Sequence, residues 1–266
     1  MPCDSSHKIV VFDLDETLGS FSELGAFWDT LRIIYNKEPD QAHFFKVLDT
    51  FPLFLRPNIL GILNTLVHAR QSNKCLGIVL YTNNQGPKKW AKLITEYFDY
   101  KLNAKVFDLI INAYKIHKRV VEPLRTSHDK NYDDLMHCTH LPYNTRVCFI
   151  DDQYHSLCDD SKVIYIPVDP YVYKPNVYVV SQKYHKAMQP NIPLDVFTQK
   201  MVFELGNHWK KQGSPLKEIG PNHLKLITGL ETFLGNSLKY TRKKKKNTTR
   251  RTRKKKKKSK QTKRTL

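Results

Sequence analysis

Four short apolar runs constrain the fold of this chain more than any other feature of its sequence. Each run is rich in β-branched and aromatic residues and is nearly continuous, rather than alternating between apolar and polar positions. Strands covered on both faces by helices have this appearance, whereas strands with one face in water alternate. We therefore expect buried strands of a parallel sheet at residues 8–15, 75–82, 146–152 and 162–168.

Helical patterns separate these runs. Residues 58–71 and 87–102 carry apolar side chains at helical spacing, and each segment has a proline at or just before its start, Pro57 and Pro87. A third helix is expected at residues 129–138. Strands that alternate with helices predict an α/β protein with a doubly wound, mainly parallel sheet, whose ligand site lies outside the carboxyl ends of the strands.

The remaining segments predict the domain organisation. An apolar helical insert at about residues 20–55 follows the first strand, and we expect it to roof part of the ligand site. The insert belongs to a main domain at residues 1–189, and two further helical patterns form a C-terminal helical appendage at 190–238. Residues 239–266 are low in complexity and rich in Lys and Arg, so we expect them to be disordered.

The positive charge of the chain is concentrated in this last segment. The chain has 44 Lys and Arg against 25 Asp and Glu, and 17 of the basic residues lie at 239–266, where no acidic residue occurs. A basic run of this kind contacts an import receptor, contacts the phosphate backbone of nucleic acid, or acts as a solubility tail. We favour the first two uses, which predict a nuclear location. Since no aromatic residue follows Tyr240, sequence-specific recognition of bases is not expected.

Cysteine usage and the lengths of the apolar runs indicate the compartment. The five cysteines include no CxxC pair, and no apolar signal segment follows Met1. Free thiols in a reducing, intracellular compartment are therefore expected. The chain also lacks a run of about 20 apolar residues, the length that a membrane helix needs, so no membrane contact is expected.

Two aspartates follow the first apolar run directly. Asp13 and Asp15 lie at the expected carboxyl end of this strand, and alternation along an extended chain points both side chains to the same side. Two carboxylates this close are costly unless a cation lies between them or one is protonated. Taken alone, the pair is equally compatible with an ordinary turn in which Asp15 and Thr17 cap the next helix.

Polar residues near the ends of the other strands favour a ligand site. One strand ends at Thr82 and another at Asp151 and Asp152, and Lys130 opens the helix that precedes the acidic pair. Oxygen ligands from Asp13 and one of the acidic pair suit a divalent cation such as Mg²⁺. Thr82 would hold phosphate oxygens, and the ammonium of Lys130 would offset the surplus negative charge.

Two choices among these residues stay open. Lys130 is favoured as the site lysine because a helix start is readily placed near carboxylates, but Lys115 and Lys118 are alternatives. The sequence also leaves open which of Asp151 and Asp152 contacts the metal ion.

The order of these residues resembles the haloacid dehalogenase superfamily of phosphohydrolases. The resemblance covers about residues 8–168 and rests on four motifs in sequence: "DLDET" at 13–17, an apolar strand that ends in Thr82, a lysine, and the acid pair at 151–152. It implies a Mg²⁺-dependent phosphomonoesterase that works through an aspartyl phosphate.

The resemblance also implies a role for each candidate residue. Asp13 would be the nucleophile, and Asp15 would protonate the leaving group and then activate water. The implied catalytic residues are Asp13, Asp15, Thr82 and Lys130, the implied substrate-binding residues are Thr17, Asn83, Asn84 and His155, and the implied metal ligands are Asp13, Asp15, Asp151 and Asp152.

Two stretches of sequence bear on the substrate. "DLDETL" and the downstream "LRPNILGIL" resemble the phosphatases that act on the C-terminal tail of RNA polymerase II, which implies a phosphoserine or phosphothreonine protein substrate. Those phosphatases usually carry Asp-Asn where this chain has Asp151 and Asp152, and "TNNQG" is closer to polynucleotide and sugar phosphatases. A nucleic-acid end or a nucleotide is therefore the alternative substrate.

One further resemblance and one alternative function also follow from the sequence. "YTNNQGPKKW" and "CFIDDQYH" are similar to members of the superfamily encoded by large DNA viruses. A catalytically inactive interaction module is the alternative from another functional class. The presence of both Asp13 and Asp15 argues against inactivity, because a scaffold has no need to hold two acids together.

Overall fold

The computed structural model describes residues 7–86, 89–211 and 222–235. Its centre is a five-stranded sheet in the order β3-β2-β1-β6-β7, in which every neighbouring pair of strands is parallel. The strands are β1 (Lys8–Phe12), β2 (Gly77–Tyr81), β3 (Leu109–Ile111), β6 (Arg146–Asp151) and β7 (Val163–Pro167). The predicted α/β class with a parallel sheet is confirmed.

Helices flank the sheet, which explains why the apolar runs are continuous. On β1, Val10 and Phe12 belong to one buried cluster, whereas Ile9 and Val11 belong to a second cluster on the opposite face. α3 (Ile59–Gln71), α4 (Trp90–Leu102) and α8 (Asn222–Leu234) contribute to the first cluster, as do the helices described below, and α5 (Tyr132–Thr139) contributes to the second. This arrangement is compatible with a doubly wound fold.

Three short pieces of the structure were not predicted. β3 is only three residues long, too short for an apolar run to identify it. β4 (Lys115–Ile116) and β5 (Arg119–Val120) form a hairpin. Its turn residues His117 and Lys118 both have positive φ, without the Asn-Gly or Asp-Gly pair that usually signals such a turn.

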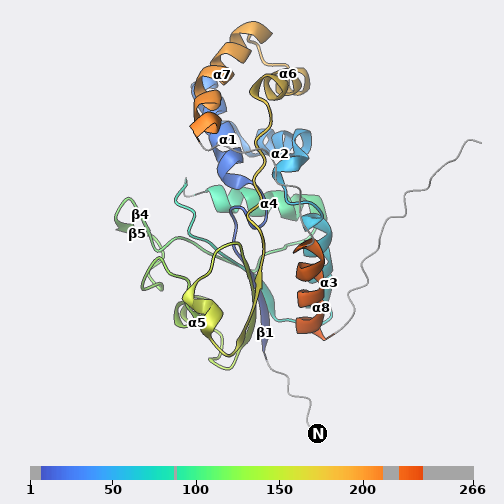
Figure 1. Ribbon diagram of the computed structural model, residues 1–266, viewed down its shortest axis with the longest axis vertical. Helices are drawn as coiled ribbons and strands as arrows, with labels where there is room; N and C mark the ends of the chain where they lie inside the picture. The colour runs from blue at the N-terminus through green and yellow to red at the C-terminus, as the bar shows by residue number, and fades with distance from the viewer. Residues whose placement is uncertain (1–6, 87–88, 212–221, 236–266) are drawn as a thin grey trace, which may run out of the picture.

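A second group of helices, which we call the helical cap, lies beyond the carboxyl ends of the strands (Figure 1). The cap consists of α1 (Phe21–Tyr35), α2 (Gln41–Thr50), α6 (Val177–Met188) and α7 (Leu194–Lys211). The segment predicted as an insert at 20–55 supplies α1, α2 and the short helix η1 (Pro52–Phe54). Tyr184 of α6 stacks on Phe197 of α7 at 5.2 Å and meets Phe27 of α1 edge to face, so aromatic packing joins the cap helices.

The helices of the segment predicted as an appendage at 190–238 lie in two different places. α7 packs in the cap against α1 and α6, whereas α8 lies on the sheet beside β6 and β7. Leu230 of α8 is fully buried there, and Lys8 Nζ donates a hydrogen bond of 2.9 Å to the carbonyl of Phe233. The basic segment at 239–266 lies outside the described residues.

The cysteines and the helix lengths relate to the expected free thiols and to the expected lack of a membrane helix. Cys75, Cys138, Cys148 and Cys158 carry free thiols, and Cys3 lies outside the described residues. Within the described part of the chain, no helix combines the length and the apolar character needed to cross a membrane.

Replacing Leu230 by Ala tests the packing of α8 on the sheet. The change removes buried apolar contacts and leaves a cavity, so we expect the free energy of unfolding to fall by about 2–5 kcal/mol in urea denaturation. Leu224 on the same helix is 66% exposed, and Leu224→Ala should cost less than about 0.5 kcal/mol. Small and equal losses for the two variants would contradict this packing.

Candidate functional site

Strand register places two of the predicted carboxylates side by side. β1 and β6 are neighbours in the sheet with Phe12 paired to Ile150, and the N–H of Asp13 donates to the carbonyl of Ile150 at 2.9 Å. Asp13 and Asp151 therefore leave adjacent strands at the same level. One carboxylate oxygen from each of Asp13, Asp151 and Asp152 lies within 4.8 Å of the others. We call these three residues the acidic cluster.

Lys130 lies between two members of the acidic cluster. Its Nζ is 2.5 Å from Oδ1 of Asp13 and 2.6 Å from Oδ2 of Asp151, and its side chain is 1% exposed. The next residue, Asn131, caps α5 by accepting a hydrogen bond from the N–H of Asp134 at 2.7 Å. This cap positions the chain that carries Lys130.

The two alternative lysines lie elsewhere. Lys115 is on β4, where its Nζ lies 4.5 Å from the centroid of the Tyr114 ring. Lys118 is exposed in the turn of the hairpin. Of the three candidate lysines, the structure brings Lys130 to the acidic cluster.

Burial makes the acidic cluster electrostatically costly. Burial raises the pKa of Asp13 and of Asp151, while the charge of Lys130 acts in the opposite direction. Burial also raises the pKa of Asp152, and the charge of Asp13 adds to this. Because one ammonium faces three carboxylates, negative charge is in excess. A divalent cation would offset that excess, and the three carboxylates supply oxygen ligands of the type that Mg²⁺ prefers.

Asp15 lies beside the acidic cluster. Its side chain is not one of the three grouped carboxylates, and its predicted role as a metal ligand stays a prediction. Its Oδ2 accepts a hydrogen bond of 2.7 Å from Nδ2 of Asn84, and its buried Oδ1 has no hydrogen-bond partner among the described residues. Burial and the charge of Asp13 raise the pKa of Asp15 to about 7. Asp15 is thereby suited to carry a proton.

Thr82 and Asn84 connect the end of β2 to the carboxylate of Asp15. Thr82 follows β2, the neighbour of β1 on its other side, and is buried. Its Oγ1 accepts a hydrogen bond of 3.0 Å from the N–H of Asn84. The amide oxygen of Asn84 in turn accepts from the N–H of Gly86 at 2.8 Å. The loop is therefore held in place next to Asp15, and the predicted contacts of Thr82 with phosphate and of Asn84 with substrate stay predictions.

Two residues predicted to bind substrate have other partners in the structure. Thr17 is 2% exposed, and its hydroxyl donates to Oδ1 of Asp152 and accepts from the N–H of the same residue. The amide of Asn83 donates to the carbonyl of His128 and accepts from Arg125. These hydrogen bonds show that Thr17 and Asn83 hold loops of the site, and their predicted contact with substrate stays a prediction.

His155 lies at the edge of the acidic cluster. Its Nδ1 is 3.2 Å from Oδ1 of Asp129, and its Nε2 is 3.7 Å from Oδ2 of Asp151. Burial lowers the pKa of His155, and the charge of Lys130 adds to this effect. The predicted substrate contact is therefore placed within reach of the cluster, with one ring nitrogen facing it.

A buried arginine that sequence reasoning did not select holds the loop after β1. Nε of Arg56 donates to the carbonyl of Thr17 at 2.5 Å, and its Nη2 donates to the carbonyls of Glu16 at 2.5 Å and Asp169 at 2.7 Å. Glu16 has a φ of 54°, a left-handed conformation that is costly for a residue with a side chain. The hydrogen bonds of Arg56 stabilise this turn. The Arg-Pro pair at 56–57 is the signal that marks it in the sequence.

A second buried arginine holds the loop after β2. Nη1 of Arg125 donates to the carbonyls of Thr82 at 3.1 Å and Asn112 at 2.7 Å. Its guanidinium lies 4.7 Å from the centroid of the Tyr81 ring. No pattern in the sequence distinguishes Arg125 from a surface arginine, since its burial depends on contacts between distant segments.

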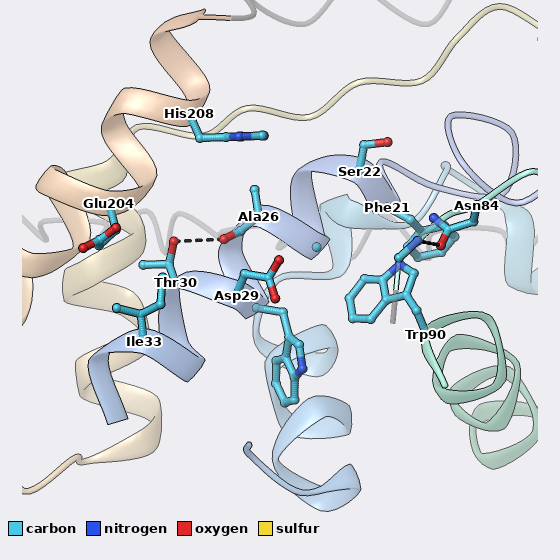
Figure 2. Close-up of a pocket in the computed structure, with 13 residues that line it drawn as sticks. Phe21, Ser22, Ala26, Asp29, Thr30, Ile33, Asn84, Trp90, Glu204 and His208 are labelled. Atoms are coloured by element: carbon cyan, nitrogen blue, oxygen red, sulfur yellow. Dashed lines mark hydrogen bonds between the residues drawn. The ribbon is translucent and has the colours of Figure 1, made fainter. Parts of the chain in front are cut away.

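A cavity of about 360 Å³ opens beside Asn84 (Figure 2). α1 forms one wall, Trp90 at the start of α4 lies near the Asn84 end, and α7 contributes Glu204 and His208. The predicted insert therefore lines a space next to the candidate site.

Replacing Lys130 by Met tests its role in the acidic cluster. The change leaves buried carboxylates without their cationic partner, so we expect the free energy of unfolding in metal-free buffer to fall by about 3–5 kcal/mol, measured in urea. Lys115→Met is the control, because Lys115 lies away from the cluster, and it should cost less than about 0.5 kcal/mol. Equal losses for both variants would be inconsistent with the geometry described here.

Removing Asp152 as a ligand tests the acidic cluster as a metal site. Mg²⁺ at about 100 times its dissociation constant should add about 2.7 kcal/mol to the free energy of unfolding. Asp152→Asn is expected to weaken Mg²⁺ binding by at least about tenfold and so to reduce this gain. Asp133→Asn, at an exposed position on α5, should leave the gain unchanged. A Mg²⁺ effect that survives Asp152→Asn in full would count against this site.

Comparison with known proteins does not assign a family. No protein-family model matches this chain, and no curated protein matches it either. The functional assignment therefore rests on the sheet, the acidic cluster and the residues that hold them.

Proposed function

We propose that this protein is a Mg²⁺-dependent phosphomonoesterase of the haloacid dehalogenase type. The acidic cluster carries the proposal: oxygens of Asp13, Asp151 and Asp152 lie within 4.8 Å of one another, and Lys130 Nζ contacts two of these residues. The position of Thr82 at the neighbouring strand end also supports it. These side chains follow the order of the four motifs of that superfamily along the chain.

Asp13 and Asp15 share the proposed chemistry. A carboxylate oxygen of Asp13 attacks the phosphorus of a phosphate monoester, and the bond from phosphorus to the leaving oxygen breaks while Asp15 gives that oxygen a proton. Water then attacks the aspartyl phosphate, and Asp15 takes a proton from it. The bond between Asp13 and phosphorus breaks, and inorganic phosphate leaves. The partner-free Oδ1 of Asp15 is suited to this proton transfer.

Other residues would hold the phosphate and the metal ion. Thr82 Oγ1 accepts from the N–H of Asn84 and so keeps its own proton for a phosphate oxygen. The ammonium of Lys130 would offset negative charge on the transferred group. Asp13, Asp151 and Asp152 would hold Mg²⁺, which when bound would neutralise phosphate charge.

A phosphoserine or phosphothreonine in a protein is the proposed substrate. The stretches "DLDETL" and "LRPNILGIL" support it through their similarity to phosphatases of the RNA polymerase II tail. "TNNQG" and the basic residues at 239–266 favour the second candidate, a nucleic-acid end. That basic segment is also proposed to contact an import receptor or nucleic acid, which would place the protein in the nucleus of a cell.

Hydrolysis of p-nitrophenyl phosphate tests the proposed chemistry. The full-length chain should release phosphate with Mg²⁺ and lose this activity in EDTA. Asp13→Asn removes the nucleophile, so kcat/KM should fall by roughly 10⁴-fold or more. The control is Asp133→Asn, which removes one carboxylate outside the site and should keep full activity. A wild-type protein without metal-dependent turnover would instead support the inactive interaction module.

A second comparison sorts the substrate classes with the same preparation. A phosphoserine peptide and a 3′-phosphorylated oligonucleotide are offered at equal concentration. Higher kcat/KM for the peptide is the expected result. Preference for the oligonucleotide would replace the protein substrate with the nucleic-acid one and leave the chemistry unchanged.

A further inference from the structure

The cavity beside Asn84 has a lining of distinctive chemistry. Its walls include the aromatic residues Phe21, Trp28 and Trp90 and the carboxylates of Asp29 and Glu204. Among the described residues, no lysine or arginine lines it. Its volume of about 360 Å³ falls in the range of pockets that bind small ligands or parts of larger ones, about 300–1,000 Å³.

The cavity adjoins the proposed phosphatase site at one residue, Asn84. Asn84 lines the cavity, donates to Oδ2 of Asp15 at 2.7 Å and donates through its N–H to Oγ1 of Thr82 at 3.0 Å. Figure 2 shows Asn84 at one end of the cavity and Glu204 at the other, with Asp29 between them on α1. A substrate with its phosphate at Thr82 would therefore extend along α1 past both carboxylates.

The two carboxylates remain able to attract a cation. Asp29 lies 3.2 Å from Arg32, but both side chains are about half exposed, so water screens this pair strongly. Arg32 is also shared with Glu38 at 3.6 Å. Glu204 is half-buried and has no ion pair among the described residues. The polar groups of the cavity therefore include these two carboxylates and the imidazole of His208, beside the aromatic walls.

We propose that this cavity binds a lysine or arginine side chain next to the phosphorylated residue of a protein substrate. The proposal rests on the proposed function and narrows its substrate class to phosphoproteins with basic flanking residues. The carboxylates of Asp29 and Glu204 would pair with the charged end, and the aromatic walls would pack against its aliphatic stem.

The same lining disfavours the nucleic-acid alternative. A polynucleotide end carries further phosphates beside the one to be removed, and these would lie along Asp29 and Glu204. Like charges brought together in a partly buried space reduce affinity, which makes the lining a source of selectivity against polyanions. The proposed catalytic residues would act on a phosphoprotein and on a polynucleotide end equally, whereas the lining of this cavity would favour the phosphoprotein.

Phosphoserine peptides of equal length test the inference. The peptides differ only in whether the residues flanking the phosphoserine are Lys, Gln or Glu, and p-nitrophenyl phosphate is assayed beside them with the full-length chain and Mg²⁺. We expect kcat/KM to decrease in the order Lys, Gln, Glu, with about a tenfold difference between Lys and Glu. Both values of kcat/KM are measured on one preparation, so a lower fraction of folded protein affects them equally and leaves their ratio unchanged.

Paired substitutions assign the preference to the cavity. In the variant Asp29→Asn/Glu204→Gln, the ratio of kcat/KM for the Lys-flanked peptide to kcat/KM for the Glu-flanked peptide should fall to about one. In the variant Asp29→Lys/Glu204→Lys, this ratio should fall below one. The control Asp133→Asn/Glu231→Gln also removes two carboxylates, at positions that do not line the cavity, and should keep the wild-type ratio. A wild-type ratio retained by Asp29→Asn/Glu204→Gln would overturn the inference.

The outcomes separate this inference from the proposed function. Turnover of p-nitrophenyl phosphate together with equal rates for the Lys and Glu peptides, or faster rates for Glu, would overturn the inference and leave the phosphatase standing. Preference for an oligonucleotide over every peptide would also overturn it. No metal-dependent turnover of any substrate would overturn both.

Discussion

The site depends on the two ion pairs that the buried ammonium of Lys130 makes with the carboxylates of Asp13 and Asp151. The register of β1 and β6 holds two acids side by side in a buried place, and without a cation their mutual repulsion and loss of water would oppose folding. Because Lys130 comes from the segment before α5, its ion pairs also tie that segment to the end of the sheet. Arg125, which lies in the same segment, donates a hydrogen bond to the carbonyl of Thr82 and so ties the segment to the end of β2 as well.

The fold class and the placing of the acids could be predicted because both depend on patterns local in sequence. Four continuous apolar runs identify four of the five strands, and parallel strands bring their carboxyl ends to one edge. Asp13, Thr82 and Asp151 follow directly after β1 and β2 or end β6, so their common location follows from the topology. Asp13 and Asp151, which meet this condition on neighbouring strands, lie together in the acidic cluster.

The remaining features depend on contacts between distant segments. Lys130 and Lys115 cannot be ranked firmly by sequence alone, since the ion pairs of Lys130 span 117 positions to Asp13 and 21 to Asp151. The hydrogen bonds by which Thr17 and Asn83 hold loops were not predicted, because a polar residue that holds a loop looks the same in sequence as one that binds substrate. The docking of α8 on the sheet was missed for the same reason, because helical periodicity predicts a helix and not its neighbour.

The division between sheet and cap has a consequence for how such a protein can diverge. The acids, the threonine and the lysine are carried at or near the ends of the sheet strands and just before α5, whereas most of the cavity wall is carried by α1 and α7. Mutation of the cap can therefore change which molecules the cavity admits without altering a group to which the proposed reaction is assigned. Asn84 lines the cavity and also bonds to Asp15 and Thr82. A substitution at this one position would therefore change both the cavity and the proposed catalytic residues.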